Sequence, residues 1–111
     1  MMTVTTETFD SEVMQAEQPV LIDFWGPRCG PCLALMPVVE ELAREYDGKL
    51  KIVKINAQEN RKLCVRLKVI GLPTFLFFDR GREMDRLTGH ITAAELKEWV
   101  QRLASRASAH F

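Results

Sequence analysis

The segment Cys29-Gly30-Pro31-Cys32 is the part of the chain best suited to chemistry, because it carries two thiols three residues apart. Residues i and i+3 in the first turn of a helix are neighbours, so their sulfur atoms can come within bonding distance. A proline in that turn loses no hydrogen bond and stiffens the small ring that a disulfide would close. The spacing predicts a dithiol/disulfide switch, with Cys29 as the exposed attacking thiol and Cys32 as the resolving thiol.

The residues on either side of this segment predict how it is positioned. Pro19–Trp25 is typical of a buried strand, whereas the apolar residues from Cys32 to Tyr46 recur at helical intervals. Cys29 is therefore expected at the N-terminal end of a helix, where unpaired N–H groups and the helix dipole stabilise an anion. A thiolate is such an anion, and it is the nucleophile of disulfide exchange.

The rest of the chain reads as alternating strands and helices. The strands expected besides Pro19–Trp25 are Thr3–Thr6, Leu50–Asn56, Thr74–Asp79 and Glu83–Thr88. The helices expected besides the one that follows the cysteines are Thr8–Gln15, Glu59–Leu67 and a last helix from Thr92 to about Ser105, with a frayed tail beyond it. Strand–helix–strand order implies a parallel crossover, and the three-residue loop Arg80-Gly81-Arg82 predicts an antiparallel hairpin.

Length and composition bound the class of protein. The chain has 111 residues, which we interpret as a single domain, and its 15 basic and 15 acidic residues give no net charge, so neither nucleic acid nor an anionic membrane is an expected partner. No apolar stretch approaches the roughly 18 residues that span a bilayer, and the N-terminus does not resemble a signal peptide. Three cysteines are an odd number, which favours a reducing compartment. We expect a cytoplasmic monomer.

With these elements in order, the chain resembles the thioredoxin family over roughly residues 3 to 105. A Cys-x-x-Cys motif near a strand–helix–strand unit is typical of that family. The matching residues are Val20-Leu21-Ile22-Asp23-Phe24-Trp25, Cys29-Gly30-Pro31-Cys32, Pro37, Lys54-Ile55-Asn56, Gly71-Leu72-Pro73-Thr74, Gly81 and Gly89. The resemblance implies an α/β thioredoxin fold, with a central mixed five-stranded sheet flanked by four helices in the order β-α-β-α-β-α-β-β-α.

The resemblance also implies a substrate-binding rim around the cysteines. It implies a cis peptide bond between Leu72 and Pro73 and places Pro73 against the disulfide. The backbone that precedes Pro73 is then expected to pair with the bound substrate chain. The residues assigned to substrate binding are Trp25, Arg28, Gly30, Pro31, Gly71, Leu72, Pro73 and Gly89. The expected substrates are proteins that contain disulfides.

Asp23 is the second residue suited to chemistry, because a carboxylate within an apolar strand is desolvated and its pKa is raised. By resemblance, Asp23 accepts the proton of Cys32, and Lys54 on the neighbouring strand is its charge partner. The implied activity is that of a protein-disulfide reductase: Cys29 attacks a substrate disulfide, and Cys32 then releases the reduced product. The chain has no flavin or nicotinamide motif, so we expect no cofactor and a separate reductase of the thioredoxin-reductase type as electron donor.

The chain departs from the family pattern next to the cysteines. Arg28 stands where the family usually has tryptophan, Leu33 stands where it often has lysine, and Gly26-Pro27 replaces a more ordinary pair. A cation about 6 Å from the Cys29 thiolate would stabilise it by roughly 0.7 to 3 kcal/mol before screening by salt. We therefore expect Arg28 to make the disulfide more oxidising.

Other interpretations of the same residues stay open. A disulfide oxidase or isomerase would use the same two cysteines, and a binding or chaperone-like scaffold would keep the fold without turnover. A zinc site would need Cys64, His90 or His110 as further ligands, but no second closely spaced pair is present, and we expect no metal. Cys64 itself is expected to be a small buried residue, with a regulatory or glutathionylated thiol as the alternative. His90 is expected in a solvated loop, with substrate contact as the alternative.

Overall fold

A five-stranded mixed sheet forms the centre of the computed structural model, which describes residues 1–108. The strands are β1 (Met2–Thr3), β2 (Val20–Trp25), β3 (Lys51–Asn56), β4 (Thr74–Asp79) and β5 (Arg82–Thr88). Their order across the sheet is β1-β3-β2-β4-β5, with β1, β3 and β2 parallel and both β4 and β5 antiparallel to their neighbours. The expected thioredoxin architecture is confirmed.

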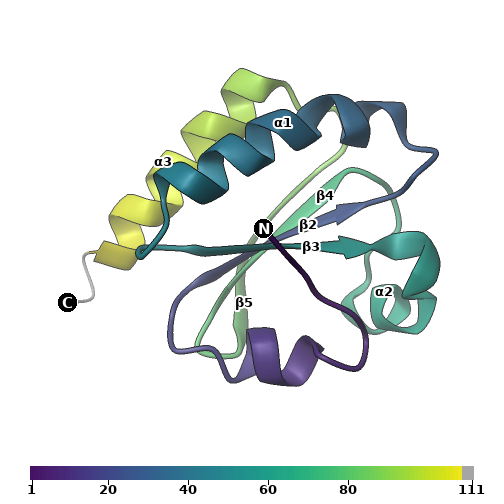
Figure 1. The fold of residues 1–111 in the computed structure, drawn as a ribbon, viewed down its shortest axis with the longest axis horizontal. Helices are drawn as coiled ribbons and strands as arrows, with labels where there is room; N and C mark the ends of the chain where they lie inside the picture. The colour runs from purple at the N-terminus through teal and green to yellow at the C-terminus, as the bar shows by residue number, and fades with distance from the viewer. Residues whose placement is uncertain (109–111) are drawn as a thin grey trace.

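Helices cover both faces of this sheet. They are α1 (Gly30–Glu45), α2 (Arg61–Leu67) and α3 (Ala93–Ser108), together with the short turns η1 (Asp10–Met14) and η2 (Ala57–Glu59). Figure 1 shows α1 and α3 side by side on one face, while η1 and α2 lie on the opposite side of the sheet. The carboxyl ends of β2 and β3 point to the same end of the molecule, where α1 begins and α2 lies (Figure 1). That end carries the two cysteines.

The side chains of β2 alternate between two separate cores. Leu21 packs with buried residues of α1 and α3, whereas Ile22 and Phe24 pack with the core under η1 and α2. Because successive side chains of a strand point to opposite faces, Asp23 and Trp25 share the face of Leu21. The strand therefore directs the Asp23 carboxyl group toward the layer formed by α1 and α3.

The structure corrects five local expectations. The helix expected over Thr8–Gln15 is only the five-residue turn η1. A hydrogen bond between residues five apart closes it, from the Gln15 N–H to the Asp10 carbonyl at 2.9 Å. The strand expected over Thr3–Thr6 is the short β1, Met2–Thr3. The loop between β4 and β5 has two residues and not three, with Arg80 at φ 52° and Gly81 at φ 78°, the conformations of a type I′ turn.

The fourth correction concerns the last helix, which does not end near Ser105. Helix α3 continues to Ser108 because its inward face carries Leu103, Ala104 and Ala107, all buried against the sheet. The rest of the expected tail, residues 109–111, lies outside the described residues.

The helix expected over Glu59–Leu67 starts later, at Arg61, because Asn60 interrupts it. The Asn60 side chain is buried, accepts a hydrogen bond from the Thr6 N–H at 2.8 Å and donates one to the Asn56 carbonyl at 2.8 Å. Asparagine competes with the backbone for hydrogen bonds in this way, so the chain forms η2 before α2.

Candidate active site

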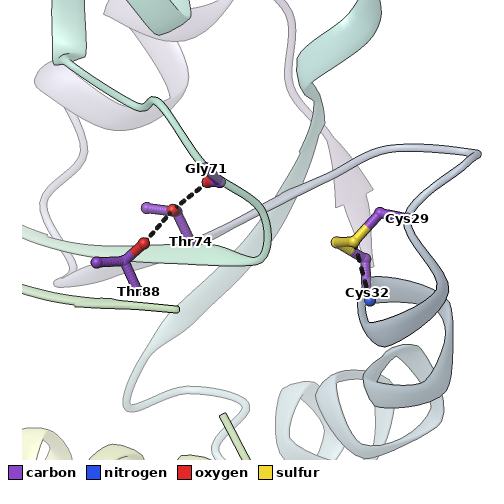
Figure 2. Close-up of a disulfide and its surroundings, with 5 residues drawn as sticks. All are labelled: Cys29, Cys32, Gly71, Thr74 and Thr88. Carbon is purple, nitrogen blue, oxygen red and sulfur yellow. Dashed lines mark hydrogen bonds between the residues drawn. A yellow bond between two sulfur atoms is a disulfide. The ribbon is translucent and has the colours of Figure 1, made fainter. Parts of the chain in front are cut away.

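The two cysteines are joined by a disulfide at the N-terminal end of α1 (Figure 2). Their Cα atoms are 5.2 Å apart, and Cys29 is the N-cap residue, whose sulfur accepts a hydrogen bond from the Cys32 N–H at 3.2 Å. Cys32 is 2% exposed, whereas Cys29 is only half buried. Gly30 and Pro31 form the exposed first turn of the helix between them. The predicted junction of strand and helix is confirmed, and Cys29 is the more accessible sulfur.

The loop that precedes β4 carries the expected cis peptide bond between Leu72 and Pro73. A hydrogen bond from the Thr74 hydroxyl to the Gly71 carbonyl, 2.6 Å long, holds this loop (Figure 2). The hydroxyls of Thr74 and Thr88 are 2.8 Å apart. Because a hydroxyl has one hydrogen, and that of Thr74 points to Gly71, Thr88 is the donor in this second bond. The loop is therefore fastened to β5 through two threonines.

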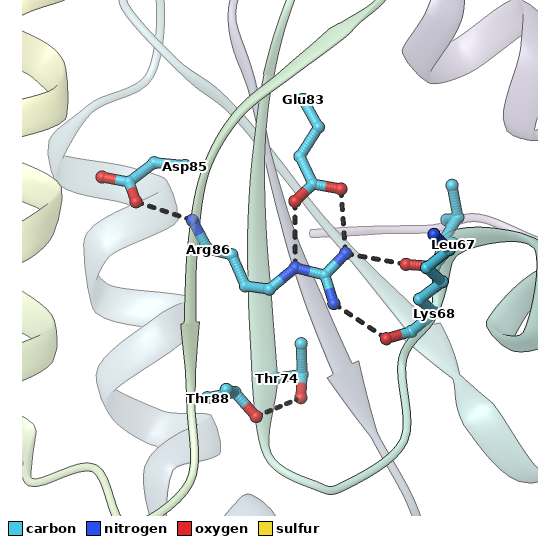
Figure 3. A network of polar contacts seen from close by, with 7 residues as sticks. All are labelled: Leu67, Lys68, Thr74, Glu83, Asp85, Arg86 and Thr88. Atoms are coloured by element: carbon cyan, nitrogen blue, oxygen red, sulfur yellow. Dashed lines mark hydrogen bonds and ion pairs between the residues drawn. The ribbon is translucent and has the colours of Figure 1, made fainter.

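A second anchor holds the start of the same loop at the end of α2 (Figure 3). The Arg86 guanidinium donates hydrogen bonds to the carbonyls of Leu67 at 2.7 Å and Lys68 at 2.8 Å, and it forms an ion pair with Glu83 at 2.9 Å. Lys68 has a φ of 58°, a left-handed conformation that costs a non-glycine residue about 1 kcal/mol. Arg86 on β5 thus stabilises the turn through which the chain enters the loop.

Asp23 lies in the middle of β2 and is 2% exposed. Burial raises the pKa of Asp23 to about 7, although the positive charge of Lys54 lowers it. One carboxylate oxygen, Oδ2, is buried without a hydrogen-bond partner among the described residues. The carboxyl group therefore holds or releases a proton near neutral pH, on the face of the sheet that α1 covers.

Lys54 lies beside Asp23 in the sheet register but does not form an ion pair with it in the described part of the chain. Its amine lies instead over the Trp25 ring, 5.8 Å from the ring centroid. Lys54 is thus an electrostatic neighbour of Asp23 and a cation–π partner of Trp25, whose ring at the end of β2 is half buried.

A groove of about 640 Å³ opens beside Cys29. Two of the residues assigned to substrate binding, Arg28 and Leu72, line it. Gly26 lets its two sides approach, since a β-carbon at this position would lie 3.1 Å from a terminal carbon of Leu72. The groove therefore joins the loop before Cys29 to the loop before Pro73.

The other residues assigned to substrate binding lie outside the lining of this groove. They are Trp25, Gly30, Pro31, Gly71, Pro73 and Gly89. Pro73 is buried, Gly71 and Gly89 are exposed, and Gly89 has a φ of 98° directly after Thr88. These glycines therefore expose backbone near the two threonines that fasten the loop.

Sequence reasoning missed one wall of the groove. The residues that it did not assign are Ala57, Gln58, Arg61, Cys64, Val65, Val69 and Ile70. One of them had a signal in the sequence, because Val65 falls off the inward face of α2 that Leu63, Cys64 and Leu67 define. An apolar residue on the outward face of a short helix indicates a contact surface.

Cys64 is the small buried residue that the sequence predicts. It is 8% exposed, its thiol lies 3.9 Å from the Ala57 carbonyl, and burial raises the pKa of this thiol. His90 is exposed. Within residues 1–108 no three histidine, cysteine, aspartate or glutamate side chains are grouped as a metal site, and His110 lies outside the described residues. In the same range, no helix combines the length and hydrophobicity that crossing a membrane requires.

Comparison with known proteins identifies the family. The thioredoxin family model matches residues 1–102. Among its relatives are thioredoxin 1 of Nostoc sp., 38% identical over 89% of this chain and 92% of that protein, and a thioredoxin of Synechocystis sp., 35% identical over 89% and 92%. The chloroplastic thioredoxin X of Arabidopsis thaliana is 44% identical over 90% of this chain and 56% of that protein.

The chain belongs to the thioredoxin family. With its Cys29–Cys32 pair at the start of α1, it is a thiol–disulfide oxidoreductase.

Proposed function

We propose that this oxidoreductase works as a reductase of protein disulfides, with Cys29 as nucleophile, Cys32 as resolving thiol and Asp23 as proton acceptor. The observation that carries the proposal is the arrangement of these three groups. The accessible sulfur is the N-cap of α1, the second sulfur is buried one turn further on, and the carboxyl group of Asp23, with a pKa of about 7, faces the layer of α1.

The first step forms a mixed disulfide. The Cys29 thiolate, stabilised by the N-terminal end of α1, attacks one sulfur of the substrate disulfide. The substrate S–S bond breaks, a Cys29–substrate S–S bond forms, and the other substrate sulfur leaves as a thiolate that takes up a proton. Leu72 lines the same groove as Cys29, and the backbone of Gly71 and Leu72, held before Pro73 by the Thr74 hydroxyl, is the segment that pairs with the substrate chain.

The second step releases the product and uses Asp23. The carboxylate takes the proton of the Cys32 thiol, and the new thiolate attacks the Cys29 sulfur. The mixed disulfide breaks, the Cys29–Cys32 disulfide forms, and the second substrate sulfur leaves. Two electrons have then passed from the protein to the substrate.

Restoring the dithiol needs two electrons and two protons from a separate reductase that acts on the same disulfide. A compartment that supplies such electrons is reducing, and we place the protein in the cytoplasm on the strength of its odd cysteine count. We further propose that it acts as a monomer, with its cysteine end free to meet the reductase and the substrates in turn.

A Cys32→Ser variant tests the proposed function. It should attack a disulfide-bonded protein such as insulin and remain attached, because no second thiolate releases the mixed disulfide. Non-reducing gel electrophoresis and mass spectrometry should show a covalent adduct at Cys29 that dithiothreitol removes. The Cys29→Ser/Cys32→Ser double variant is the matched control and should form no adduct, since Cys64 is buried. A binding scaffold without turnover would give no adduct with either variant.

Replacing Arg28 by tryptophan tests the effect of the cation before Cys29. Arg28 is exposed and forms no ion pair with a described residue, so its charge remains available to the nearby thiolate. At exposed positions such an attraction is on the order of 1 kcal/mol. We expect the thiolate of Arg28→Trp to form at higher pH and the reduction potential to fall by about 20 mV.

Thiolate absorbance against pH, and equilibration in redox buffers, measure these two quantities. Lys62→Gln is the control, because it removes an exposed positive charge outside the lining of the groove at Cys29. An unchanged titration in Arg28→Trp would exclude the electrostatic role of Arg28. A wild-type potential near about −270 mV fits a reductant, whereas about −200 to −120 mV would favour the alternative of an oxidase or isomerase.

A further inference from the structure

The groove beside Cys29 has properties that disulfide exchange alone does not require. One wall comes from α2 and the loop after it, and the other comes from the loop between β2 and α1. These segments lie at the same end of the sheet (Figure 1). A substrate segment attached to Cys29 therefore meets this groove at once.

The α2 wall exposes large apolar side chains to water. Ile70 is 96% exposed and Val65 is 79% exposed, and both line the groove together with the half-buried Leu72. Exposed apolar groups that gather on one surface mark a contact site, because covering them removes apolar area from water.

The same groove carries uncompensated positive charge. Arg28 lies on one wall and Arg61 on the other, and neither forms an ion pair with a described residue. Its lining contains no acidic side chain. Arg66, also on α2, shows the contrast, since it is paired with Asp10 at 3.3 Å. The whole chain has no net charge, whereas the lining of this groove has two arginines and no carboxylate.

We propose that the groove selects protein substrates in which the target cysteine is flanked by an apolar and an acidic residue. This inference rests on the proposed function and names the substrate class of the same site. The apolar side chain packs against Val65, Ile70 and Leu72, and the carboxylate lies between Arg28 and Arg61. These contacts form while the Cys29–substrate bond forms, so they raise the rate of attack and leave the exchange of sulfur bonds unchanged.

Disulfide-linked peptide homodimers test the charge preference. Three dimers differ only in one residue beside each cysteine, which is Glu, Gln or Lys, and all carry Leu on the other side. The reduced wild-type protein is mixed with each dimer, and released peptide thiol is followed by acid quenching, alkylation and mass spectrometry. We expect the Glu dimer to react about fivefold faster than the Gln dimer and the Lys dimer to react more slowly. High salt should bring the three rates together.

Arg61→Gln is the informative variant, because it removes one of the two arginines that line the groove and leaves Arg28, the neighbour of Cys29 in the sequence, in place. It should lower the ratio of the Glu rate to the Gln rate from about five to about two. Lys62→Gln is the matched control, since it removes the same charge from an exposed residue of α2 that does not line the groove. It should keep all three rates of the wild-type protein.

The apolar half of the proposal has its own variant. Ile70→Ser should slow all three dimers by about three- to fivefold, because a side chain that is 96% exposed contributes to docking and not to the core. Met84→Ser on β5, at a residue that is 57% exposed and outside the groove, is the control and should change none of the rates.

Each outcome decides one question. Equal wild-type rates for the three dimers overturn the proposed selectivity and leave the disulfide-reductase function intact. An Arg61→Gln protein with the wild-type ratio, or a Lys62→Gln protein with an equally reduced ratio, also overturns it. Failure of the wild-type protein to release thiol from any dimer contradicts the proposed function itself.

Discussion

Replacing Asp23 by asparagine (Asp23→Asn) is expected to raise the free energy of unfolding at about pH 8 by about 2 to 4 kcal/mol. The side chain is 2% exposed, and one of its oxygens has no hydrogen-bond partner among the described residues. Burial raises the pKa of Asp23 to about 7, although Lys54 lowers it, so the ionised form is costly in the folded state. Asparagine keeps the size of the side chain and removes the charge.

The direction of the pH effect follows from proton binding. Between about pH 4 and 7 the folded protein keeps a proton on Asp23 that the unfolded chain, with a pKa of 3.8 at this residue, has already released. Raising the pH through this window therefore lowers the free energy of unfolding. One pKa unit corresponds to about 1.4 kcal/mol, so the loss amounts to about 4 kcal/mol by about pH 7 and then stops.

Urea unfolding between about pH 4 and 9 measures this effect as the difference between wild type and Asp23→Asn. The difference is needed because Asp85 acts in the opposite direction. Burial raises the pKa of Asp85, but hydrogen bonds from the Arg86 amide, Trp99 and Arg106 together lower it below its ordinary value. The stability that ionised Asp85 contributes to the folded protein is therefore lost at acid pH. Because Asp85 is present in both proteins, its effect cancels in the difference between their free energies of unfolding.

Asp47→Asn is the control, because Asp47 is exposed and loses the same charge. A difference between wild type and Asp23→Asn that does not change with pH would contradict a buried carboxyl group that titrates near neutrality.

The same variant separates stability from catalysis. Without the carboxylate, deprotonation of Cys32 loses its base, and release of a substrate from Cys29 should slow by about tenfold or more near pH 7. The lifetime of the mixed disulfide, followed by acid quenching, measures that step. An unchanged lifetime beside the expected gain in stability would make Asp23 a buried core carboxylate with no catalytic role.

Asp23 also shows why part of the site was predictable. A carboxylate at an alternate position of an apolar strand is desolvated whatever the rest of the fold, so its burial and raised pKa follow from local sequence. The Cys29–Cys32 spacing is local in the same way, since the first turn of one helix defines it. The parallel pairing of β2 with β3 was predictable because strand–helix–strand connections admit few topologies.

The groove could not be predicted, because its walls come from segments far apart in the sequence. Ile70 follows Val69 in an apolar stretch, and only the folded chain shows that Val69 is buried while Ile70 is 96% exposed. Arg61 reads as an ordinary solvated charge until α2 is placed beside Cys29. The end of α3 was missed because its last turn is stabilised by packing against the sheet, and packing overrides weak local preference.

The role of Arg86, too, is visible only in the folded chain. Replacing Arg86 by methionine is expected to lower the free energy of unfolding by about 2 kcal/mol. Its guanidinium satisfies the carbonyls of Leu67 and Lys68, which have no partner inside α2, and it pairs with Glu83 (Figure 3). Hydrogen bonds to a charged donor contribute about 1.5 to 3 kcal/mol each when buried, and the 30% exposure of this side chain reduces that value. Urea unfolding measures the loss.

Arg86→Lys and Arg82→Met are the matched variants. Lysine keeps the charge beside Glu83 but cannot present two donors in a fixed plane, so we expect a loss of about 1 kcal/mol. Arg82 lies on the same strand, is exposed and forms no ion pair with a described residue, so Arg82→Met should leave stability unchanged. Equal losses of stability in Arg82→Met and Arg86→Met would show that removing a positive charge from β5 causes the effect, and not the loss of the bonds from Arg86 to the carbonyls of Leu67 and Lys68.

The effect on function should appear in binding more than in turnover. Loss of Arg86 removes the donor that binds the carbonyl of the left-handed Lys68. The chain from Lys68 to Pro73 carries Val69, Ile70 and Leu72, which line the groove. A loosened wall docks substrate less well, while the cysteines on α1 keep their geometry. We therefore expect Arg86→Met to raise KM for a protein disulfide by about three- to tenfold with little change in kcat, and faster hydrogen exchange at the amides of Lys68 and Val69. A fall in kcat at constant KM would instead show that β5 acts on the cysteines themselves.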